Sequence, residues 1–154
     1  MGETMADDRP LTLEDMAGYL AKGCKPESAF RIGAEHEKFP FRTASLAPIP
    51  YDGPDGIRAL LEGLERFDWK PVREGETLIA LERGGANVSL EPGGQFELSG
   101  APLETIHDVY EETEQHLDEG KQFGEELGIG FLALGMTPTW RRDEIPVMPK
   151  GRYK

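Results

Sequence analysis

Four glutamates in two short segments are the residues whose types and spacing best suit chemistry. Glu35 and Glu37 lie in "GAEHE", and Glu91 and Glu97 flank the Pro-Gly-Gly turn of "LEPGGQFELS". Side chains alternate between the two faces of a strand, so Glu35 and Glu37 are predicted to share a face while His36 points to the other. A strand face with several carboxylates is suited to holding a divalent cation such as Mg²⁺.

The hairpin around the Pro-Gly-Gly turn decides whether the second pair of glutamates joins the first. Matching the apolar residues of "NVSL" with those of "QFEL" predicts that Glu91 lies opposite Glu97, whereas a one-residue slip would place them on opposite faces. Like charges opposite each other destabilise a sheet, and a bound cation would neutralise them. The pattern therefore indicates a platform for Mg²⁺ and nucleotide phosphates, although solvated faces of amphipathic strands would show it too.

Both acidic segments are expected on strands of an antiparallel sheet. The aromatic and β-branched content of "FRIGAEHEKFPF" favours a strand, and residues 69–99 form short runs separated by Gly-containing turns. Such spacing is typical of an antiparallel meander. The apolar run "IGFLALGM" predicts a further, buried strand.

Two short helices are expected before the meander. Thr12 and Asp15 resemble a capping pair, and a stop near Gly23 completes a short amphipathic helix. Asp55 is the candidate cap of a second helix, "GIRALLEGLERF". Its apolar stripe consists of Ile57, Leu60, Leu61 and Leu64.

The longest expected helix follows the meander and runs from about Leu103 to Leu127. Its acidic surplus indicates a solvated face. The side expected to pack on the sheet carries Ile106, Val109, Tyr110, Thr113, Leu117 and Phe123.

Composition restricts the classes of partner. The chain has 154 residues and is 38% hydrophobic, which is enough for one domain with a core, and 17 basic against 29 acidic residues give a net charge of −12. This charge disfavours nucleic acid and anionic membranes as partners, and no apolar run of membrane length is present. The single cysteine, Cys24, excludes an internal disulfide. Together with the lack of a signal peptide, it predicts a cytoplasmic location.

Other chemistry is not indicated by the sequence. No Ser-His-Asp arrangement, P-loop or dinucleotide-binding glycine pattern is visible, so no catalytic nucleophile or acid–base residue is assigned. Structural roles are expected for the histidines and tryptophans, because none belongs to a spaced ligand set. These residues are His36, His107, His116, Trp69 and Trp140.

Four stretches in order carry a resemblance to a known family. They are "RIGAEHEKFPF", "NVSLEPGGQFELSGAPLETIH", "LGIGFLALGMTPTW" and "MPKGRYK", and together they resemble the amino-terminal portion of a plant-type glutamate–cysteine ligase. The resemblance implies an α+β fold in which an antiparallel sheet with flanking helices forms part of a glutamine synthetase-like catalytic core. Residues 1–29 are then an N-terminal tail with a short helix, and residues 30–154 are the partial ligase core.

The resemblance also implies a reaction and its ligands. ATP-dependent ligation of the γ-carboxylate of glutamate to the amine of cysteine would give γ-glutamylcysteine, the first step of glutathione biosynthesis. By motif, Mg²⁺ ligands would be Glu35, Glu37 and Glu97, with Glu91 as a fourth, and Arg152 would bind an anionic substrate. The expected small molecules are glutamate, cysteine and ATP, with no nucleic acid or membrane partner.

Length separates this chain from the family it resembles. Family members continue well past "MPKGRYK", so the chain is expected to be a fragment with little ligase activity alone, and its partner would be the remainder of the ligase. Met136 stands where an aromatic residue is expected, which affects packing more than chemistry. Two alternatives remain: a related carboxylate–amine ligase with another amine acceptor, and a non-catalytic metal- or nucleotide-binding module.

Overall fold

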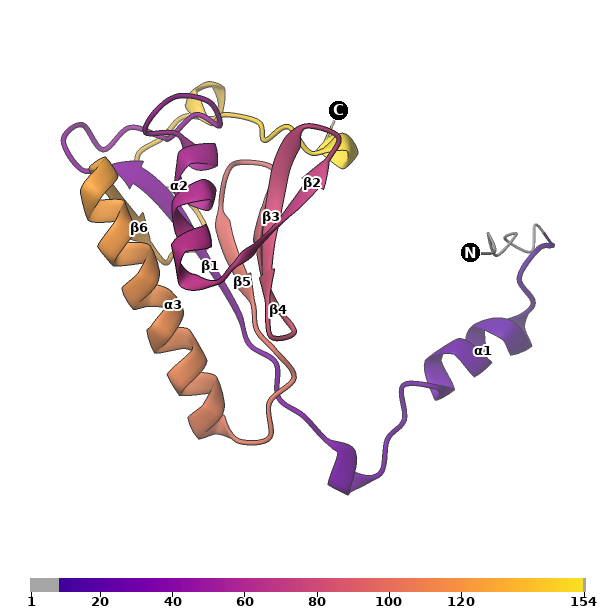
Figure 1. Ribbon diagram of the computed structural model, residues 1–154. Coiled ribbons are helices and arrows are strands. Elements are labelled where there is room, and N and C mark those ends of the chain that lie inside the picture. The colour runs from indigo at the N-terminus through magenta and orange to yellow at the C-terminus, as the bar shows by residue number, and fades with distance from the viewer. Residues whose placement is uncertain (1–8, 154) are drawn as a thin grey trace. The chain divides into compact units, whose positions relative to one another are not determined.

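A computed structural model describes residues 9–153, and the chain divides between Phe30 and Arg31 into two compact units. Figure 1 shows the elements of each unit. The first unit contains helix α1, Leu13–Ala21, and a short 3-10 helix, Glu27–Ala29. The second unit contains the sheet and the two other α-helices.

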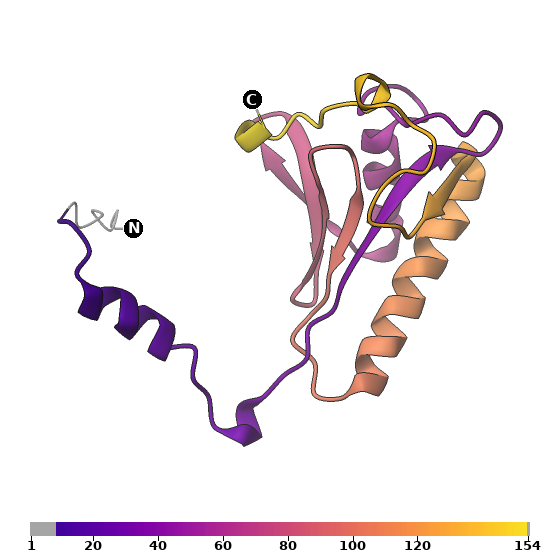
Figure 2. The same cartoon turned by 180° about the vertical axis from the view of Figure 1, so that it is seen from behind.

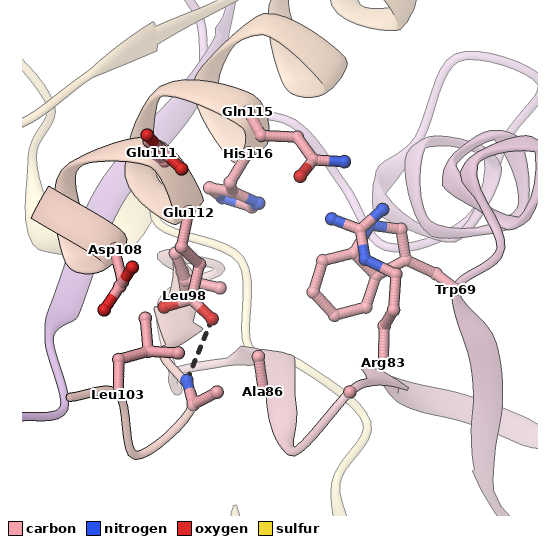
Figure 3. Close-up of a pocket in the computed structure, with 12 residues that line it drawn as sticks. Trp69, Arg83, Ala86, Leu98, Leu103, Asp108, Glu111, Glu112, Gln115 and His116 are labelled. Atoms are coloured by element: carbon pink, nitrogen blue, oxygen red, sulfur yellow. Dashed lines mark hydrogen bonds between the residues drawn. The ribbon is translucent and has the colours of Figure 1, made fainter. Parts of the chain in front are cut away.

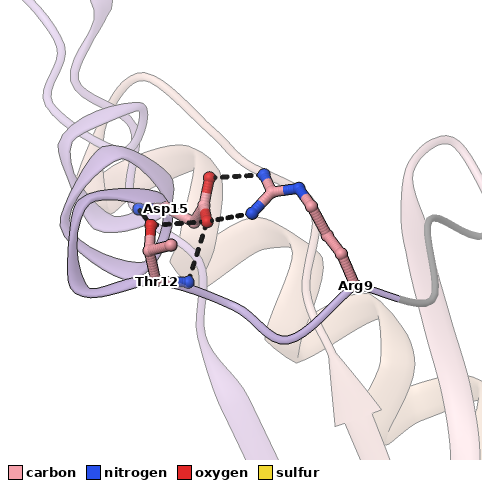
Figure 4. Close-up of polar contacts among 3 residues, drawn as sticks. All are labelled: Arg9, Thr12 and Asp15. Atoms are coloured by element: carbon pink, nitrogen blue, oxygen red, sulfur yellow. Dashed lines mark hydrogen bonds and ion pairs between the residues drawn. The ribbon is translucent and has the colours of Figure 1, made fainter.

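The start of α1 is fixed by the capping pair that the sequence predicts (Figure 4). The Asp15 carboxylate accepts hydrogen bonds from the Thr12 backbone N–H at 2.8 Å and from its hydroxyl at 2.6 Å, while the Asp15 N–H donates to Thr12 Oγ1 at 3.1 Å. Arg9 donates two further bonds, at 2.6 and 2.8 Å, to the same carboxylate. Arg9, followed by Thr12, holds the pKa of Asp15 well below its usual value, so the cap stays ionised.

A six-stranded sheet in the order β2-β3-β4-β5-β1-β6 forms the second unit (Figure 1). Each pair of neighbouring strands is antiparallel. The strands are β1 Glu35–Arg42, β2 Lys70–Glu74, β3 Thr77–Arg83, β4 Ala86–Leu90, β5 Phe96–Ser99 and β6 Ile129–Leu132. The predicted α+β class, an antiparallel sheet with flanking helices, is confirmed.

Helices α2, Ile57–Leu64, and α3, Ile106–Leu127, cover one face of this sheet, as Figures 1 and 2 show from opposite sides. The predicted apolar stripe of α2 is completely buried. Its predicted cap is wrong, because Gly56 is the N-cap residue and no side chain caps the helix. The Asp55 carboxylate instead forms a two-pronged ion pair with Arg42 at the end of β1.

The buried side of α3 is rotated from the predicted one. Ile106 is 62% and Tyr110 63% exposed, because the helix faces the sheet with two glycines and two polar residues as well as apolar ones. The buried residues are Val109, His116, Glu119, Gly120, Phe123 and Gly124. Gly124 is required by close packing, since a Cβ there would lie 2.8 Å from the Ile129 carbonyl oxygen. A count of apolar residues cannot detect a buried helix face that includes glycines and polar residues.

Part of the C-terminal segment, residues 133–153, passes over the other face of the sheet (Figure 2). This segment includes the 3-10 helices Arg142–Glu144 and Gly151–Tyr153 and buries Met148, whose N–H donates to the Pro92 carbonyl at 3.0 Å. Another 3-10 helix, Glu65–Phe67, follows α2. Within residues 9–153, the helices are too short or too polar to cross a membrane.

Candidate functional site

Three of the predicted glutamates lie on the sheet face away from α2 and α3. Glu37 is directly opposite Glu97 in the β1–β5 pair, and Glu35 is opposite Ser99. Strand alternation therefore places the three carboxylates on one face, as predicted. His36 is opposite Leu98, whose side chain is in the core, so the prediction that His36 faces away is also confirmed.

The predicted register of the β4–β5 hairpin is wrong by two residues. Glu97 is opposite Ser89, not Glu91, and the Glu91 N–H donates to the Gln95 carbonyl across a tight turn. The turn closes because the Gly94 N–H donates to the Glu91 carbonyl at 2.9 Å while Gly94 has φ +83°, a conformation that favours glycine. A two-residue shift preserves side-chain facing, so Glu91 remains near Glu97 despite the error.

The environment of Glu91 differs from that of an exposed carboxylate. Partial burial raises its pKa, and the Glu97 carboxylate raises it further, while Arg152 opposes both effects. The Arg152 guanidinium lies 3.2 Å from Glu91 Oε1 and also donates to the Tyr153 hydroxyl at 2.6 Å. The structure thus brings the predicted substrate-binding residue, Arg152, to the acidic hairpin.

The C-terminal residues are anchored at this hairpin through the carbonyl of Leu90. Lys150 Nζ donates to that oxygen at 2.9 Å, and the Tyr153 hydroxyl donates to it at 3.0 Å. Burial of Lys150 lowers its pKa, while the glutamates nearby, Glu91 first, favour its charged form. Two cationic side chains and two carboxylates therefore meet where β4 ends.

Lys38 lies behind the acidic face and was missed by sequence reasoning. Its side chain is 1% exposed, with Nζ 3.3 Å from both His36 Nδ1 and the His36 carbonyl and 5.8 Å from the Phe96 ring centroid. Burial lowers its pKa to about 8, although the charge of Glu97 acts in the opposite direction. The sequence did contain a signal for the burial of Lys38. Strand alternation places Lys38 on the same face as His36, and this face is turned toward the core.

An aromatic pocket continues the acidic face along β1. Phe39 lies two residues beyond Glu37 and meets the Trp140 ring edge-on, with centroids 5.8 Å apart. Trp140 Nε1 donates to the Leu46 carbonyl at 2.7 Å, which fixes the indole. The pocket has a volume of about 250 Å³ and is lined by Phe39, Phe41, Leu46, Leu132, Thr137, Pro138, Thr139 and Trp140. Trp140 is thus a packing residue, as predicted, that also forms a pocket wall.

A second hollow lies at the opposite end of the acidic face. It has a volume of about 290 Å³ and is lined by Gly33, Ala34, Glu35, Ser99 and Gly100. Glu35 is therefore accessible from solvent at the edge of the same face.

Metal ligation by these glutamates remains a prediction. Oxygen donors on one face suit Mg²⁺, which prefers carboxylates combined with water and phosphate oxygens. In the part of the chain that the structure describes, however, no group of three or more His, Cys, Asp or Glu side chains is arranged to hold a metal ion. Glu35, Glu37 and Glu97 share a face without converging on one point.

Comparison with known proteins assigns most of the chain to one family. Residues 31–154 match the family described as glutamate-cysteine ligase family 2 (GCS2). The chain is 53% identical over 152 residues to a chloroplastic glutamate–cysteine ligase of Arabidopsis thaliana and 53% identical over 153 residues to chloroplastic glutamate–cysteine ligase A of Oryza sativa subsp. japonica. It is 55% identical over 146 residues to the chloroplastic enzyme of Solanum lycopersicum.

These relatives are much longer than the chain. The alignments cover 98%, 99% and 94% of this chain but only 28%, 30% and 27% of the Arabidopsis, rice and tomato proteins, respectively. The relatives are chloroplastic, which overturns the predicted cytoplasmic location. A single cysteine indicates a reducing environment and cannot distinguish between compartments that share one.

Proposed function

We propose, because the chain belongs to the glutamate–cysteine ligase family 2, that it contributes the acidic sheet face of an enzyme that joins L-glutamate to L-cysteine with ATP. The product would be γ-glutamylcysteine, and its formation would be the first step of glutathione biosynthesis. The observation that carries this proposal is the direct opposition of Glu37 and Glu97, with Glu35 on the same face.

The proposed reaction has two substitutions. An oxygen of the glutamate γ-carboxylate attacks the γ-phosphorus of ATP, and the bond from that phosphorus to the β–γ bridging oxygen breaks, which releases ADP. The cysteine nitrogen then attacks the γ-carbonyl carbon of the acyl phosphate, and inorganic phosphate leaves with the carbonyl C–O bond electrons while the nitrogen loses a proton. Such transfers depend chiefly on positioning and electrostatic stabilisation.

The carboxylates that would hold Mg²⁺ are Glu35, Glu37 and Glu97, with Glu91 at the hairpin. The bound ion would neutralise phosphate charge as the phosphoryl group moves. These residues fit Mg²⁺ for two reasons. All of their donor atoms are oxygens, and a divalent cation would relieve the repulsion between the carboxylates of Glu37 and Glu97, which lie opposite each other on β1 and β5.

Arg152 is proposed to bind an anionic group of a substrate. Its side chain is 61% exposed and is held beside Glu91, so a carboxylate or phosphate could approach the guanidinium from solvent. Lys150 has a structural part in this proposal, because its bond to the Leu90 carbonyl keeps the segment that carries Arg152 against β4. Arginine suits the role through its planar set of N–H donors.

The aromatic pocket beyond Glu37 supports a nucleotide as the ligand of this face. Phe39 and Trp140 offer apolar ring surfaces, and the alternation of β1 places the pocket on the same side as Glu37. A purine in the pocket would leave its phosphates directed along the strand toward the carboxylates. Base stacking on aromatic side chains provides useful binding energy.

The binding part of this proposal can be tested on the 154-residue chain. Titration calorimetry with MgATP should show binding that is weakened at least tenfold in Glu37→Gln and Glu97→Gln. Glu114→Gln, on the opposite side of the molecule in the exposed part of α3, is the matched control. Equal MgATP affinity in all four proteins would overturn the acidic face as the nucleotide site.

The catalytic part requires the longer protein, since the chain spans less than a third of its relatives. ADP release should need both glutamate and cysteine, and Glu97→Gln should reduce it strongly. The chain alone is proposed to turn over slowly or not at all. Amine-dependent release with another amine in preference to cysteine would instead assign a related ligase.

A further inference from the structure

A pocket on the helix-covered side of the sheet lies away from the acidic face. It has a volume of about 300 Å³ and opens between α3 and the β3–β4 turn. Figure 3 shows Glu112, Gln115 and His116 on the helical wall and Arg83 with Trp69 on the other. Ala86 and Leu98, which belong to the core-facing sides of β4 and β5, complete its floor.

His116 lines this pocket with its hydrogen-bonding capacity unused. Its side chain is 1% exposed, and within residues 9–153 neither ring nitrogen has a hydrogen-bond partner. The ring stacks on Phe96 at 6.1 Å and meets Trp69 edge-on at 6.4 Å, so its orientation is fixed by packing. Burial lowers its pKa to about 3, with further lowering by Lys38, His36 and Arg83, so at neutral pH the ring offers one N–H donor and one nitrogen acceptor. Leaving both unused is costly, and a ligand would satisfy them.

Arg83 supplies spare donors from the opposite wall. Its NH1 donates to the Phe67 carbonyl at 2.7 Å and to Glu119 Oε1 at 2.8 Å, and the guanidinium lies over the Trp69 ring at 4.2 Å. Among the described residues, the Nε and NH2 groups of Arg83 have no hydrogen-bond acceptor. An arginine fixed at one nitrogen with the others available is arranged to receive a carboxylate.

Carboxylates give the helical wall the opposite charge. Asp108, Glu111 and Glu112 all line the pocket, and the last of these has one oxygen, Oε1, engaged by the Ala101 N–H at 3.0 Å. Its other oxygen is buried without a partner in the described part of the chain. The pocket is therefore negatively charged along α3 and carries the Arg83 guanidinium on the opposite wall. This separation of charges is complementary to a molecule with an ammonium group at one end and a carboxylate at the other.

We infer that this pocket binds a small zwitterion of the amino-acid class, with the carboxylate received by Arg83 and the His116 N–H and the ammonium group held by the carboxylates of α3. The site is on the opposite face of the sheet from Glu37 and Glu97, so it is separate from the proposed ligase site. It does not depend on that proposal.

Nuclear magnetic resonance of the ¹⁵N-labelled chain tests the inference directly. Trp69 and Trp140 give the two indole N–H signals, and a Trp140→Phe variant assigns them. Glycine and 4-aminobutyrate are the probes, with acetate and methylammonium as ligands that carry only one of the two charges. At least one zwitterion should shift the Trp69 signal saturably and leave Trp140 unchanged, whereas each single-charge ligand should bind at least tenfold more weakly.

His116→Phe is the decisive variant because it keeps a ring between Phe96 and Trp69 but removes both nitrogens. It should fold and lose the zwitterion response, while the matched control His107→Phe, an exposed position on the same helix outside the pocket lining, should retain it. Methylammonium binding as tightly as the zwitterions would show a simple cation site and overturn the inference. An unchanged Trp69 signal with every probe, or an equal response in His116→Phe, would also overturn it.

Discussion

Glu37 lies directly opposite Glu97 across the β1–β5 pair, on the sheet face that α2 and α3 leave open. Two carboxylates at facing positions of neighbouring strands repel each other and destabilise the sheet. A bound cation or other favourable contacts can offset this repulsion. The pairing therefore connects the stability of the sheet to occupancy of the proposed Mg²⁺ site.

Glu97→Gln should stabilise the metal-free chain by about 0.5–1 kcal/mol, since it removes one of two like charges at a cross-strand pair while preserving side-chain shape. Urea unfolding in the presence of a chelator measures the change in the free energy of unfolding. Glu114→Gln removes an acidic charge from exposed α3 and should change it by less than half as much. A destabilised Glu97→Gln chain would show that this side chain is structural.

Added Mg²⁺ should raise the midpoint temperature of wild-type unfolding and should do so much less in Glu97→Gln. Binding to the folded state alone stabilises it by mass action, so the shift should grow with Mg²⁺ concentration. Differential scanning calorimetry across a concentration series, with Na⁺ matched for ionic strength, separates binding from general screening. The same shift in wild type and Glu97→Gln would place the cation elsewhere.

Lys38 should make stability rise with pH in the alkaline range. Its pKa is about 8 in the folded chain against a usual 10.5, because burial disfavours the charge. Between these values the unfolded chain binds more protons than the folded chain, so the free energy of unfolding contributed by this group increases as pH rises from about 8 to 10.5.

Lys38→Met tests this effect by removing the amine while keeping a side chain of similar length. The variant should be more stable than wild type by about 2–3 kcal/mol at pH 7, and this advantage should shrink as the wild-type amine loses its proton. Urea unfolding at pH 7 and pH 9.5 gives the comparison, with Lys121→Met as the exposed control. A constant difference between the two pH values would contradict the assigned pKa shift.

Local pattern was sufficient to place Glu35 and Glu37 on one face, because strand alternation depends only on neighbouring residues. Local pattern could not identify the residue opposite Glu97 on β4. The hairpin register depends on the left-handed conformation of Gly94, and the sequence of this turn is compatible with more than one loop length. Burial of His116 depends on its stacking against Phe96 of β5, which is distant in sequence, so helical periodicity could not reveal it. Alternation along β1 turns Lys38 toward the core, but lysines are rarely fully buried, so the pattern did not single it out.

Gly63→Ala should destabilise the sheet unit by about 1–3 kcal/mol through overpacking between α2 and α3. A Cβ at this position would lie 1.8 Å from Phe123 Cε1, and the Arg66 guanidinium, 4.3 Å from the centroid of that ring, limits how far the ring can yield. Urea unfolding monitored by Trp69 fluorescence, in a Trp140→Phe background so that Trp69 is the single fluorophore of this type, reports on this core. Gly18→Ala in α1 is the control, because a Cβ there has no neighbour within 4 Å, and it should leave the same transition unchanged.

Trp140→Leu should weaken binding of MgATP by about five- to a hundredfold while leaving the affinity for magnesium tripolyphosphate unchanged. The substitution removes the indole that meets Phe39 edge-on in the wall of the aromatic pocket, so only a ligand with a base should be affected. Trp140→Phe retains an aromatic wall but loses the hydrogen bond to the Leu46 carbonyl, and it should give an intermediate affinity. Titration calorimetry with both ligands separates loss of base stacking from disturbance of the acidic face. Equal weakening of both ligands would show that Trp140 supports the fold of the site, and undiminished MgATP binding would place the base outside this pocket.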